Sequence, residues 1–198
     1  MNVENKVIVI TGGGNGIGRE LELALLRKGA RVAALDINAL SLNETFEIAG
    51  DLKSKLSIPT IDITNETDVF SITKTIIDIH DYIDGIINCA GIIQPFVDVA
   101  DIDFNVIRKL INVNIYGTLF MVKAFIDHLK ERPEAFIVNI SSMGGIIPVY
   151  GQTLYGATKA AIKIFTEGLS LELRKTNIHI MVVFPGGVNT NIIKNSGG

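Results

Sequence analysis

Short apolar runs alternate along the chain with longer stretches in which apolar residues recur every three or four positions. The short runs are continuous and rich in Val, Ile and Leu, which is typical of strands buried on both faces of a parallel sheet. The longer stretches have the period of amphipathic helices. The pattern predicts strands at residues 6–11, 31–36, 56–61, 85–88, 135–141 and 179–184, and helices at residues 16–28, 38–52, 66–80, 101–130 and 153–176.

This alternation of strands and helices predicts an α/β fold in which helices cover both faces of a parallel sheet. No repeat or linker interrupts the pattern, so a single domain over residues 1–198 is predicted. The net charge of −3 argues against nucleic acid as a partner. Mean hydropathy is high, at +0.37, but no apolar run reaches the length of a membrane span, and buried parallel strands explain the value.

Three further sequence features narrow the class of protein. No secretory signal precedes the first strand and Cys89 is the single cysteine, which predicts a cytoplasmic protein. The three histidines stand far apart without the spacing of metal ligands, so no metal site is predicted. No G-x-S-x-G motif occurs, which argues against a Ser-His-Asp hydrolase.

A glycine-rich turn joins the first predicted strand to the first predicted helix, and its residues 11–18 read Thr-Gly-Gly-Gly-Asn-Gly-Ile-Gly. Glycines let a diphosphate approach the backbone, and a helix N-terminus offers free N–H groups to an anion, which together predict a dinucleotide-binding turn. The G-x-G-x-x-G spacing does not fit. A P-loop is disfavoured because Arg19 and Glu20 stand where it needs Lys and Ser or Thr. A turn that merely reverses the chain is the alternative.

An acidic residue, Asp36, ends the second predicted strand and lies 20 residues after Gly16. At this offset an acid meets a ribose 2′-hydroxyl, and a carboxylate there repels a 2′-phosphate, so NAD is preferred over NADP. Asp36 could instead cap the helix that begins near Asn38. Asp62 follows the third predicted strand and either receives the adenine amino group or turns the chain; the spacing does not decide between these roles.

A tyrosine and a lysine, Tyr155 and Lys159, share one face of the last predicted helix. A nearby ammonium favours the phenolate and lowers the pKa of a tyrosine, whose hydroxyl can then act as an acid or base near neutral pH. Ser142 follows the fifth predicted strand and could hold a substrate oxygen beside the Tyr155 hydroxyl. An amphipathic surface contact is the alternative for an isolated pair. The small residues at 88–91, Asn-Cys-Ala-Gly, would let a flat ligand lie close to the backbone.

Together these motifs resemble the short-chain dehydrogenase/reductase family in its classical form. The turn at 11–18 is similar to the family's T-G-x-x-x-G-x-G motif, and residues 88–91 are similar to its N-N-A-G motif, with Cys89 in place of the second Asn. Residues 112–117 resemble the helix segment that carries the active-site Asn, and residues 185–190 resemble the P-G motif. The resemblance implies a Rossmann-type doubly wound parallel sheet with the strand order 3-2-1-4-5-6.

The resemblance also implies a reaction, hydride transfer between NAD(H) and an alcohol or carbonyl substrate. Tyr155 would be the catalytic acid or base, and Lys159 would lower its pKa and hold the nicotinamide ribose. Ser142 would polarise the substrate carbonyl, and Asn114 would seat a water in a proton relay. The residues then expected to bind the cofactor, besides Tyr155 and Lys159, are Gly12, Gly14, Asn15, Gly16, Ile17, Gly18, Asp36, Ile37, Asp62, Ile63, Asn88, Ala90, Gly91, Pro185, Gly186, Val188 and Thr190.

The chain departs from the family pattern after the P-G motif. Family members continue with a substrate loop, a helix and a seventh strand, whereas this sequence ends at Gly198, so the seventh edge strand and most of the lid are expected to be absent. A catalytically impaired NAD-binding or interaction protein is therefore the alternative function. A sugar-nucleotide epimerase or dehydratase is disfavoured, because such relatives carry a larger C-terminal domain.

Two expectations about partners complete the sequence-based picture. The predicted helices at 101–130 and 153–176 are those through which family members pair, which implies a homodimer or homotetramer. The substrate is expected to be hydrophobic or to contain a ring, because the residues that should surround it are mostly apolar. These residues are Ile93, Gln94, Pro95, Phe96, Met143, Ile146, Ile147, Val149 and Tyr150.

Overall fold

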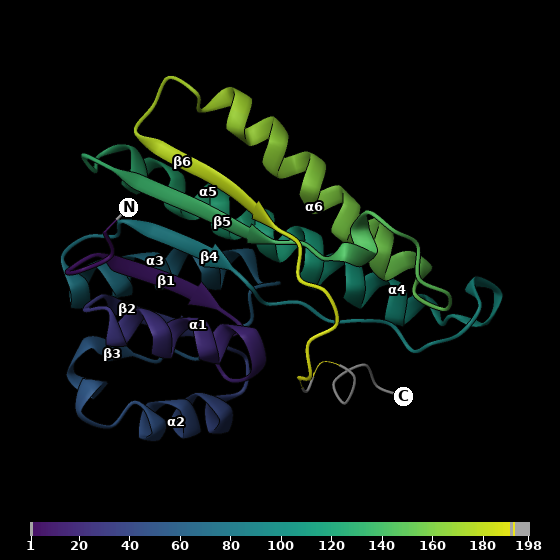
Figure 1. Cartoon of the computed structure of the whole chain (residues 1–198), viewed down its shortest axis with the longest axis horizontal. Coiled ribbons are helices and arrows are strands. Elements are labelled where there is room, and N and C mark those ends of the chain that lie inside the picture. The colour runs from purple at the N-terminus through teal and green to yellow at the C-terminus, as the bar shows by residue number, and fades with distance from the viewer. Residues whose placement is uncertain (1, 191, 193–198) are drawn as a thin grey trace.

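A six-stranded parallel sheet forms the centre of the computed structural model, which describes residues 2–190 and 192 (Figure 1). The strand order is β3-β2-β1-β4-β5-β6, so the predicted fold class and strand order are confirmed. The order reverses between β1 and β4, and ligands of such sheets bind at the carboxyl ends of the strands beside this switch point. The strands span Val7–Thr11 (β1), Arg31–Leu35 (β2), Leu56–Ser57 (β3), Gly85–Asn88 (β4), Ala135–Ile140 (β5) and Ile178–Val183 (β6).

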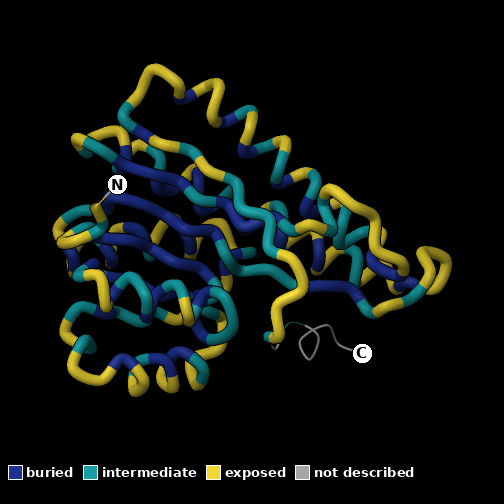
Figure 2. Tube along the Cα trace, in the orientation of Figure 1, coloured by how far each residue is buried: buried dark blue, intermediate teal, exposed yellow. Residues whose placement is uncertain are grey.

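Helices cover both faces of the sheet, because successive residues of a strand point to opposite faces. In β1, Val7 and Val9 join one core with helices α3, α5 and α6, whereas Ile8 and Ile10 join a second core with α1 and α2. The central strands β1 and β4 are buried along their whole length (Figure 2). The helices span Gly16–Arg27 (α1), Ala39–Ile48 (α2), Glu66–His80 (α3), Phe104–Ile111 (α4), Thr118–Lys130 (α5) and Thr153–Glu172 (α6).

The third strand is shorter than the sequence pattern predicts. The apolar run predicts a strand at residues 56–61, but β3 covers only Leu56–Ser57, and a single bridge between Asp36 and Thr60 follows it. Pro59 explains the interruption, because proline has no N–H to donate to a neighbouring strand.

The second helix is also shorter than predicted. Its pattern predicts residues 38–52, but α2 ends at Ile48 and a 3₁₀ turn follows at Gly50–Lys55. Gly50 adopts a positive φ of 56° just after the helix, a conformation that glycine reaches without strain and that commonly ends a helix.

The long helix predicted at residues 101–130 is divided in the structure. A π-helical turn at Asn112–Gly117 separates α4 from α5, and a 3₁₀ turn at Val99–Asp101 precedes α4. A Cβ at Gly117 would lie 2.6 Å from the Ile63 side chain, so the π turn packs closely against the segment between β3 and α3. Single π turns inside α-helices are frequent at functional sites.

By length and composition alone, the helical segment Phe104–Lys130 could cross a membrane, although the sequence pattern indicated no run of that length. Its Met121, Phe125 and Leu129 side chains are buried in the core that α3, α5 and α6 form with the sheet. Core helices also have the length and apolar composition of a membrane span, and the buried side chains place this segment among them. Within the described residues β6 is one edge of the sheet. The prediction that most of the substrate lid is absent falls on the chain after residue 192, and these residues lie outside the described part.

Candidate active site

A cavity of about 850 Å³ lies at the carboxyl ends of the strands. Its walls come from the segments that follow all six strands, together with α4, the π turn and α6. The volume is within the range of small-molecule and cofactor sites. Most predicted site residues line it, namely Gly12, Asn15, Gly16, Ile17, Gly18, Asp36, Ile37, Asp62, Ile63, Ala90, Gly91, Ser142, Tyr155, Lys159, Pro185, Gly186, Val188 and Thr190, whereas Gly14, Asn88 and Asn114 do not.

The turn between β1 and α1 has the backbone geometry of an anion site. Gly12 and Gly16 adopt positive φ angles of 76° and 55°, which glycine tolerates. Gly18 leaves no space for a side chain, because a Cβ there would overlap the Gly12 carbonyl oxygen. Asn15 precedes α1, and among the described residues its side chain makes no capping hydrogen bond. The first N–H groups of α1 can therefore receive a diphosphate at the positive end of the helix dipole.

Asp36 follows β2 directly and faces the glycine turn. Its Oδ2 accepts a hydrogen bond from the Gly14 N–H at 2.9 Å, and its Oδ1 accepts one from the Asn38 N–H at 3.0 Å. The side chain that caps α2 is Asn38, which accepts from the Ser41 N–H at 3.1 Å, so Asp36 is not the cap of this helix. Each carboxylate oxygen retains a lone pair that can accept from a ribose hydroxyl.

Asp62 lines the same cavity and also stabilises a local turn. Its Oδ1 accepts hydrogen bonds from the Thr64 N–H at 2.9 Å and from the Thr64 hydroxyl at 2.8 Å. The residue is exposed, and its second oxygen can still accept from an amino group. The two roles considered for Asp62 from the sequence are therefore compatible.

The end of β4 is held to the end of β1 by Thr11, which belongs to the predicted turn but was not among the residues expected to bind the cofactor. The Thr11 hydroxyl oxygen accepts hydrogen bonds from the Cys89 N–H at 3.0 Å and from the Ala90 N–H at 3.1 Å. Asn88 lies below the cavity, where its Nδ2 donates to Asn139 at 2.8 Å. Burial raises the pKa of the Cys89 thiol to about 11, so this side chain is a small apolar residue and not a thiolate.

Tyr155 and Lys159 of α6 and Ser142 after β5 line the cavity beside the segment that follows β4. The Lys159 side chain is buried, and its Nζ donates to the Ile140 carbonyl at 2.9 Å. The Ser142 hydroxyl oxygen accepts from the Gly144 N–H at 3.0 Å. This arrangement brings a phenol, a hydroxyl and an ammonium to one wall of the cavity.

Asn114 lies in the π turn and is buried behind this wall. Its Oδ1 accepts from the Ile92 N–H at 2.9 Å, and its Nδ2 donates to the Ile92 carbonyl and to the Thr158 hydroxyl, each at 3.0 Å. The side chain thus ties the π turn to the segment after β4 and to α6.

Burial shifts the ionisation of both Tyr155 and Lys159. It raises the pKa of the Tyr155 hydroxyl, and the side-chain interaction with Ser142 lowers it by less. Burial lowers the pKa of Lys159 to about 8. In this structure the Lys159 Nζ is 6.0 Å from the centre of the Tyr155 ring and is bonded to the Ile140 carbonyl, so a lowering of the Tyr155 pKa by Lys159 stays a prediction.

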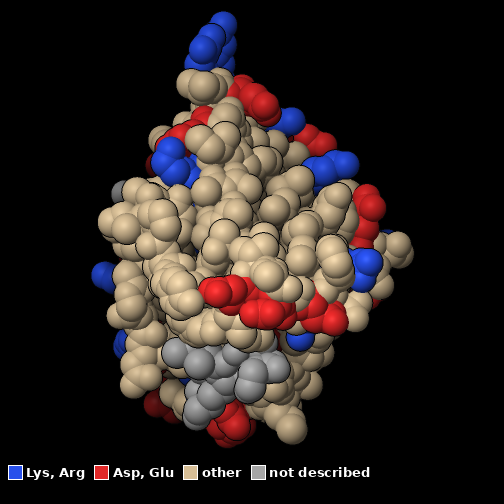
Figure 3. Space-filling view, turned by 90° about the vertical axis from the view of Figure 1, so that its right-hand side faces the viewer, with Lys and Arg blue, Asp and Glu red and all other residues tan. Residues whose placement is uncertain are grey.

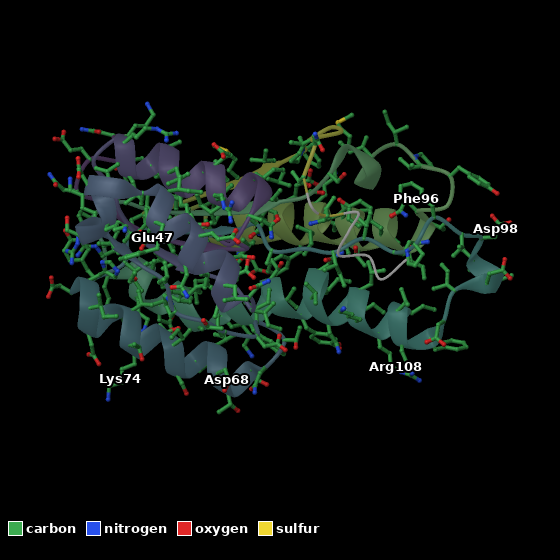
Figure 4. The ribbon with its side chains drawn as sticks, turned by 90° about the horizontal axis from the view of Figure 1, so that it is seen from below. Glu47, Asp68, Lys74, Phe96, Asp98 and Arg108 are labelled. Carbon is green, nitrogen blue, oxygen red and sulfur yellow. The ribbon has the colours of Figure 1, made fainter. Side chains whose placement is uncertain are left out.

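The outer part of the cavity is apolar. Ile93, Phe96, Met143 and Val149 line it as the sequence predicts. Figure 3 looks onto this end of the molecule and shows mainly uncharged side chains above a band of acidic ones, and Figure 4 places Phe96 at this end, far from Glu47. Of the other residues expected around the substrate, Ile146, Ile147 and Tyr150 are exposed and do not line the cavity, and Gln94 is buried.

Several lining residues were not among the site residues predicted from the sequence, although Cys89, Val113 and Gly187 lie within its motifs. They reach the cavity because the fold brings the ends of separate strands together, which spacing along the chain does not show. Within residues 2–190 and 192, no group of three His, Cys, Asp or Glu side chains could hold a metal ion. The additional lining residues are Leu35, Asn38, Ser41, Ile61, Cys89, Ile92, Lys109, Val113, Ile140, Ser141, Gly144, Gln152, Gly187 and Ile192.

Comparison with known proteins adds independent information on the family of this chain. The model of a family described as short chain dehydrogenase matches residues 6–197. An uncharacterized oxidoreductase of Staphylococcus epidermidis is 33% identical over 190 residues, which are 95% of this chain and 80% of that protein. The fold is similar to that of a 3-ketoacyl-(acyl-carrier-protein) reductase from Brucella melitensis complexed with NADH, with a TM-score of 0.92 and 26% identity over 97% of this chain and 79% of that one. It is also similar to ElxO with NADP bound, with a TM-score of 0.90 and 29% identity over 96% of this chain and 77% of that one.

Proposed function

We propose that this chain, which belongs to the short-chain dehydrogenase family, is an oxidoreductase that transfers a hydride between NAD(H) and an alcohol or ketone. Family membership and the likeness to a reductase complexed with NADH and to a protein with NADP bound support the reaction class. One observation carries the proposal: Tyr155, Ser142 and Lys159 line the same cavity as the glycine turn.

The cofactor assignment rests on Asp36. The similar structures hold either NADH or NADP, so the likeness alone does not select one of them. Asp36 lies at the cavity wall with both oxygens toward backbone N–H groups of the turn and of the segment after β2. A carboxylate at this place accepts from ribose hydroxyls and repels a 2′-phosphate, which supports NAD over NADP. The diphosphate would lie at the N-terminus of α1.

The proton chemistry belongs to the side chains of the cavity wall. Tyr155 would exchange a proton with the substrate oxygen, and Ser142 would donate a hydrogen bond to that oxygen. The Lys159 ammonium, now bonded to the Ile140 carbonyl, would bind the nicotinamide ribose and favour the phenolate from there. Asn114, behind this wall, would seat a water in a proton relay, as the family resemblance implies. When bound, the nicotinamide supplies or accepts the hydride.

The apolar outer cavity supports a neutral, hydrophobic substrate. Phe96, Met143 and Val149 would contact its carbon skeleton, and no basic side chain other than Lys109 and Lys159 is among the described lining residues. Association through α4, α5 and α6 into a homodimer or homotetramer, and a cytoplasmic location, stay predictions. So does the assignment of residues 1–198 to a single domain.

Two measurements test the function. NADH binding is followed by its fluorescence, and turnover is followed by NADH absorbance with a panel of secondary alcohols and apolar ketones. We expect NADH to bind more tightly than NADPH. An Asp36→Asn variant should bind NADH more weakly and narrow the difference between the two cofactors. A wild-type protein that binds NADPH more tightly would overturn the assignment of NAD.

The role of Tyr155 is tested by Tyr155→Phe with Tyr150→Phe as its control. Both substitutions remove one phenolic oxygen, but Tyr150 is 85% exposed and does not line the cavity. Tyr155→Phe should keep NADH binding and lose about 10²- to 10⁴-fold in turnover, whereas Tyr150→Phe should keep both. Wild-type turnover in Tyr155→Phe would contradict the role. NADH binding without turnover of any substrate by the wild-type protein would instead favour a binding function.

A further inference from the structure

A buried glutamine connects the segment after β4 to the start of α6. Gln94 is 0% exposed. Its Oε1 accepts hydrogen bonds from the Leu154 and Tyr155 N–H groups, each at 3.0 Å, and its Nε2 donates to the Gly151 carbonyl at 3.0 Å. Its own carbonyl accepts from the Gln152 Nε2 at 2.8 Å. One residue thus makes four hydrogen bonds within the five positions that lead into and begin the helix of the proposed catalytic tyrosine.

These bonds satisfy groups that the helix itself cannot satisfy. The first N–H groups of an α-helix have no partner within the helix and need a cap. Gln152 occupies the capping position of α6, but its side chain makes no capping bond among the described residues. The Oε1 of Gln94, which comes from the segment after β4, caps the helix instead. These hydrogen bonds stabilise the fold only while that segment and the start of α6 stay in contact.

The backbone of Tyr155 is held on its other side as well. The Thr158 hydroxyl donates to the Tyr155 carbonyl at 2.8 Å, and that same hydroxyl oxygen accepts from the Asn114 Nδ2 at 3.0 Å. Gln94 therefore holds the N–H of Tyr155, while Thr158 and Asn114 hold its carbonyl. A residue whose two backbone groups are both fixed by side chains has little freedom to shift along or around the helix axis.

We propose that Gln94 is a positioning residue for Tyr155, which sets the place of the Tyr155 hydroxyl relative to Ser142 and to the cavity. The inference rests on the proposed oxidoreductase function. Proton transfer demands close placement of the donor and acceptor, and a displacement of about 1 Å can cost on the order of 100-fold in rate. Gln94 does not touch the cavity, so its effect on the reaction would pass through the start of α6.

The test compares two substitutions of Gln94 with a matched control elsewhere. Gln94→Met keeps the approximate volume and removes every side-chain hydrogen bond. Gln94→Glu keeps the acceptor for the Leu154 and Tyr155 N–H groups. Asn177→Leu removes another amide that bonds to backbone carbonyls, those of Leu129 and Arg132, at a distance from the cavity. This control reports what a general loss of stability does to the same assays.

Turnover and cofactor binding are measured on all three variants below their melting temperatures. Gln94→Met should lose about 30- to 100-fold in kcat while its Kd for NADH stays within about twofold of the wild-type value. Gln94→Glu should recover at least about tenfold of that loss, and Asn177→Leu should keep the wild-type kcat. Wild-type kcat in Gln94→Met, or no recovery in Gln94→Glu, would overturn the proposal.

Amide hydrogen exchange measured by NMR gives a readout that needs no substrate. In Gln94→Met, the amide hydrogens of Leu154 and Tyr155 should exchange at least about tenfold faster than in the wild-type protein, with little change in Asn177→Leu. Unchanged exchange at these two amides would overturn the positioning role even if the protein is an active dehydrogenase. Faster exchange in a protein that turns over no substrate would reject the oxidoreductase function and leave the anchoring of Tyr155 by Gln94 supported.

Discussion

A carboxyl group buried below the glycine turn should make the stability of the fold depend on pH. Glu22 of α1 is 0% exposed, and neither of its carboxyl oxygens has a hydrogen-bond partner within the described residues. A Cβ at Gly13 would lie 2.5 Å from its Oε2, so the carboxyl group packs directly against the turn. Burial raises the pKa of Glu22 to about 8, and the Asp36 charge adds to this effect while the Arg19 charge opposes it.

The magnitude follows from proton linkage. Between pH 4.5, the ordinary pKa of Glu22, and pH 8, the folded protein keeps a proton that the unfolded chain releases. The free energy of unfolding therefore falls as pH rises across this window, by about 1.4 kcal/mol per pH unit. From pH 5.5 to 7.5 the loss due to this group is about 3 kcal/mol. Below pH 4.5 both states are protonated and the group contributes no pH dependence.

The substitution Glu22→Gln removes the titration and keeps the shape. The unfolding free energy of wild type and variant is measured by urea denaturation, followed by circular dichroism, at pH 5.5, 6.5 and 7.5. The variant should gain on the wild type by about 1.4 kcal/mol for each pH unit. An unpartnered amide costs about 1–3 kcal/mol, but this offset is the same at every pH, so the slope is the decisive quantity.

A second variant guards against this offset. Glu22→Met replaces the carboxyl group with an apolar side chain of similar length. Its gain in unfolding free energy over the wild type should have the same slope with pH as that of Glu22→Gln, and it should be more stable than Glu22→Gln at every pH. A difference between wild type and both variants that stays constant from pH 5.5 to 7.5 would refute the reasoning. In that case Glu22 would have to be charged in the folded protein, with a partner that the structure does not give it.

Three further outcomes are expected. Arg132→Met should destabilise the fold by about 3 kcal/mol in urea denaturation, because the Arg132 Nε bonds to the buried Asp84 at 2.9 Å and the substitution leaves that carboxylate with Lys6, whose Nζ is 3.7 Å away; unchanged stability would contradict this. Gly18→Ala should abolish NADH binding measured by fluorescence, since its Cβ would overlap the Gly12 carbonyl oxygen; tight binding would contradict this. Cys89 should react with iodoacetamide on the order of 100-fold more slowly than a free thiol at pH 8, by mass spectrometry, because its pKa is raised to about 11; reaction at the rate of a free thiol would contradict the raised pKa.

Local patterns in the sequence were enough to predict the fold class. Continuous apolar runs and helical periodicity predict a parallel sheet covered by helices on both faces, whereas the order of the six strands was implied by the family resemblance. The glycine turn and Asp36 could be assigned to one site from the sequence, because the end of a strand and the number of residues between the turn and the acid can both be read from it. The shortened β3 could have been anticipated from Pro59, whose missing N–H is also a sequence property.

The internal chemistry of the site depends on packing between distant segments and could not be predicted in the same way. The pairing of Gln94 with Tyr155 joins residues 61 positions apart, and no periodicity indicates it. The placement of Tyr155 and Lys159 on one face was predicted from their spacing on one helix, whereas the hydrogen bond of Lys159 to the Ile140 carbonyl depends on packing between distant segments. The burial of Glu22 below Gly13 was likewise not apparent, because a helix pattern shows which face is apolar and not how deep that face lies.

The π turn at Asn112–Gly117 fixes the rotational phase between the two halves of a long helix. One residue corresponds to 100° around an α-helix of 3.6 residues per turn, so a single widened turn changes which faces of α4 and α5 are aligned. The Asn114 carbonyl, at this site, accepts from the Thr118 hydroxyl at 3.2 Å. Deleting one residue here would restore a regular helix but rotate either Asn114 away from Thr158 or Met121 away from the core. The π turn thus allows Asn114 to face Thr158 while Met121 faces the core, which a regular helix over the same residues would not allow.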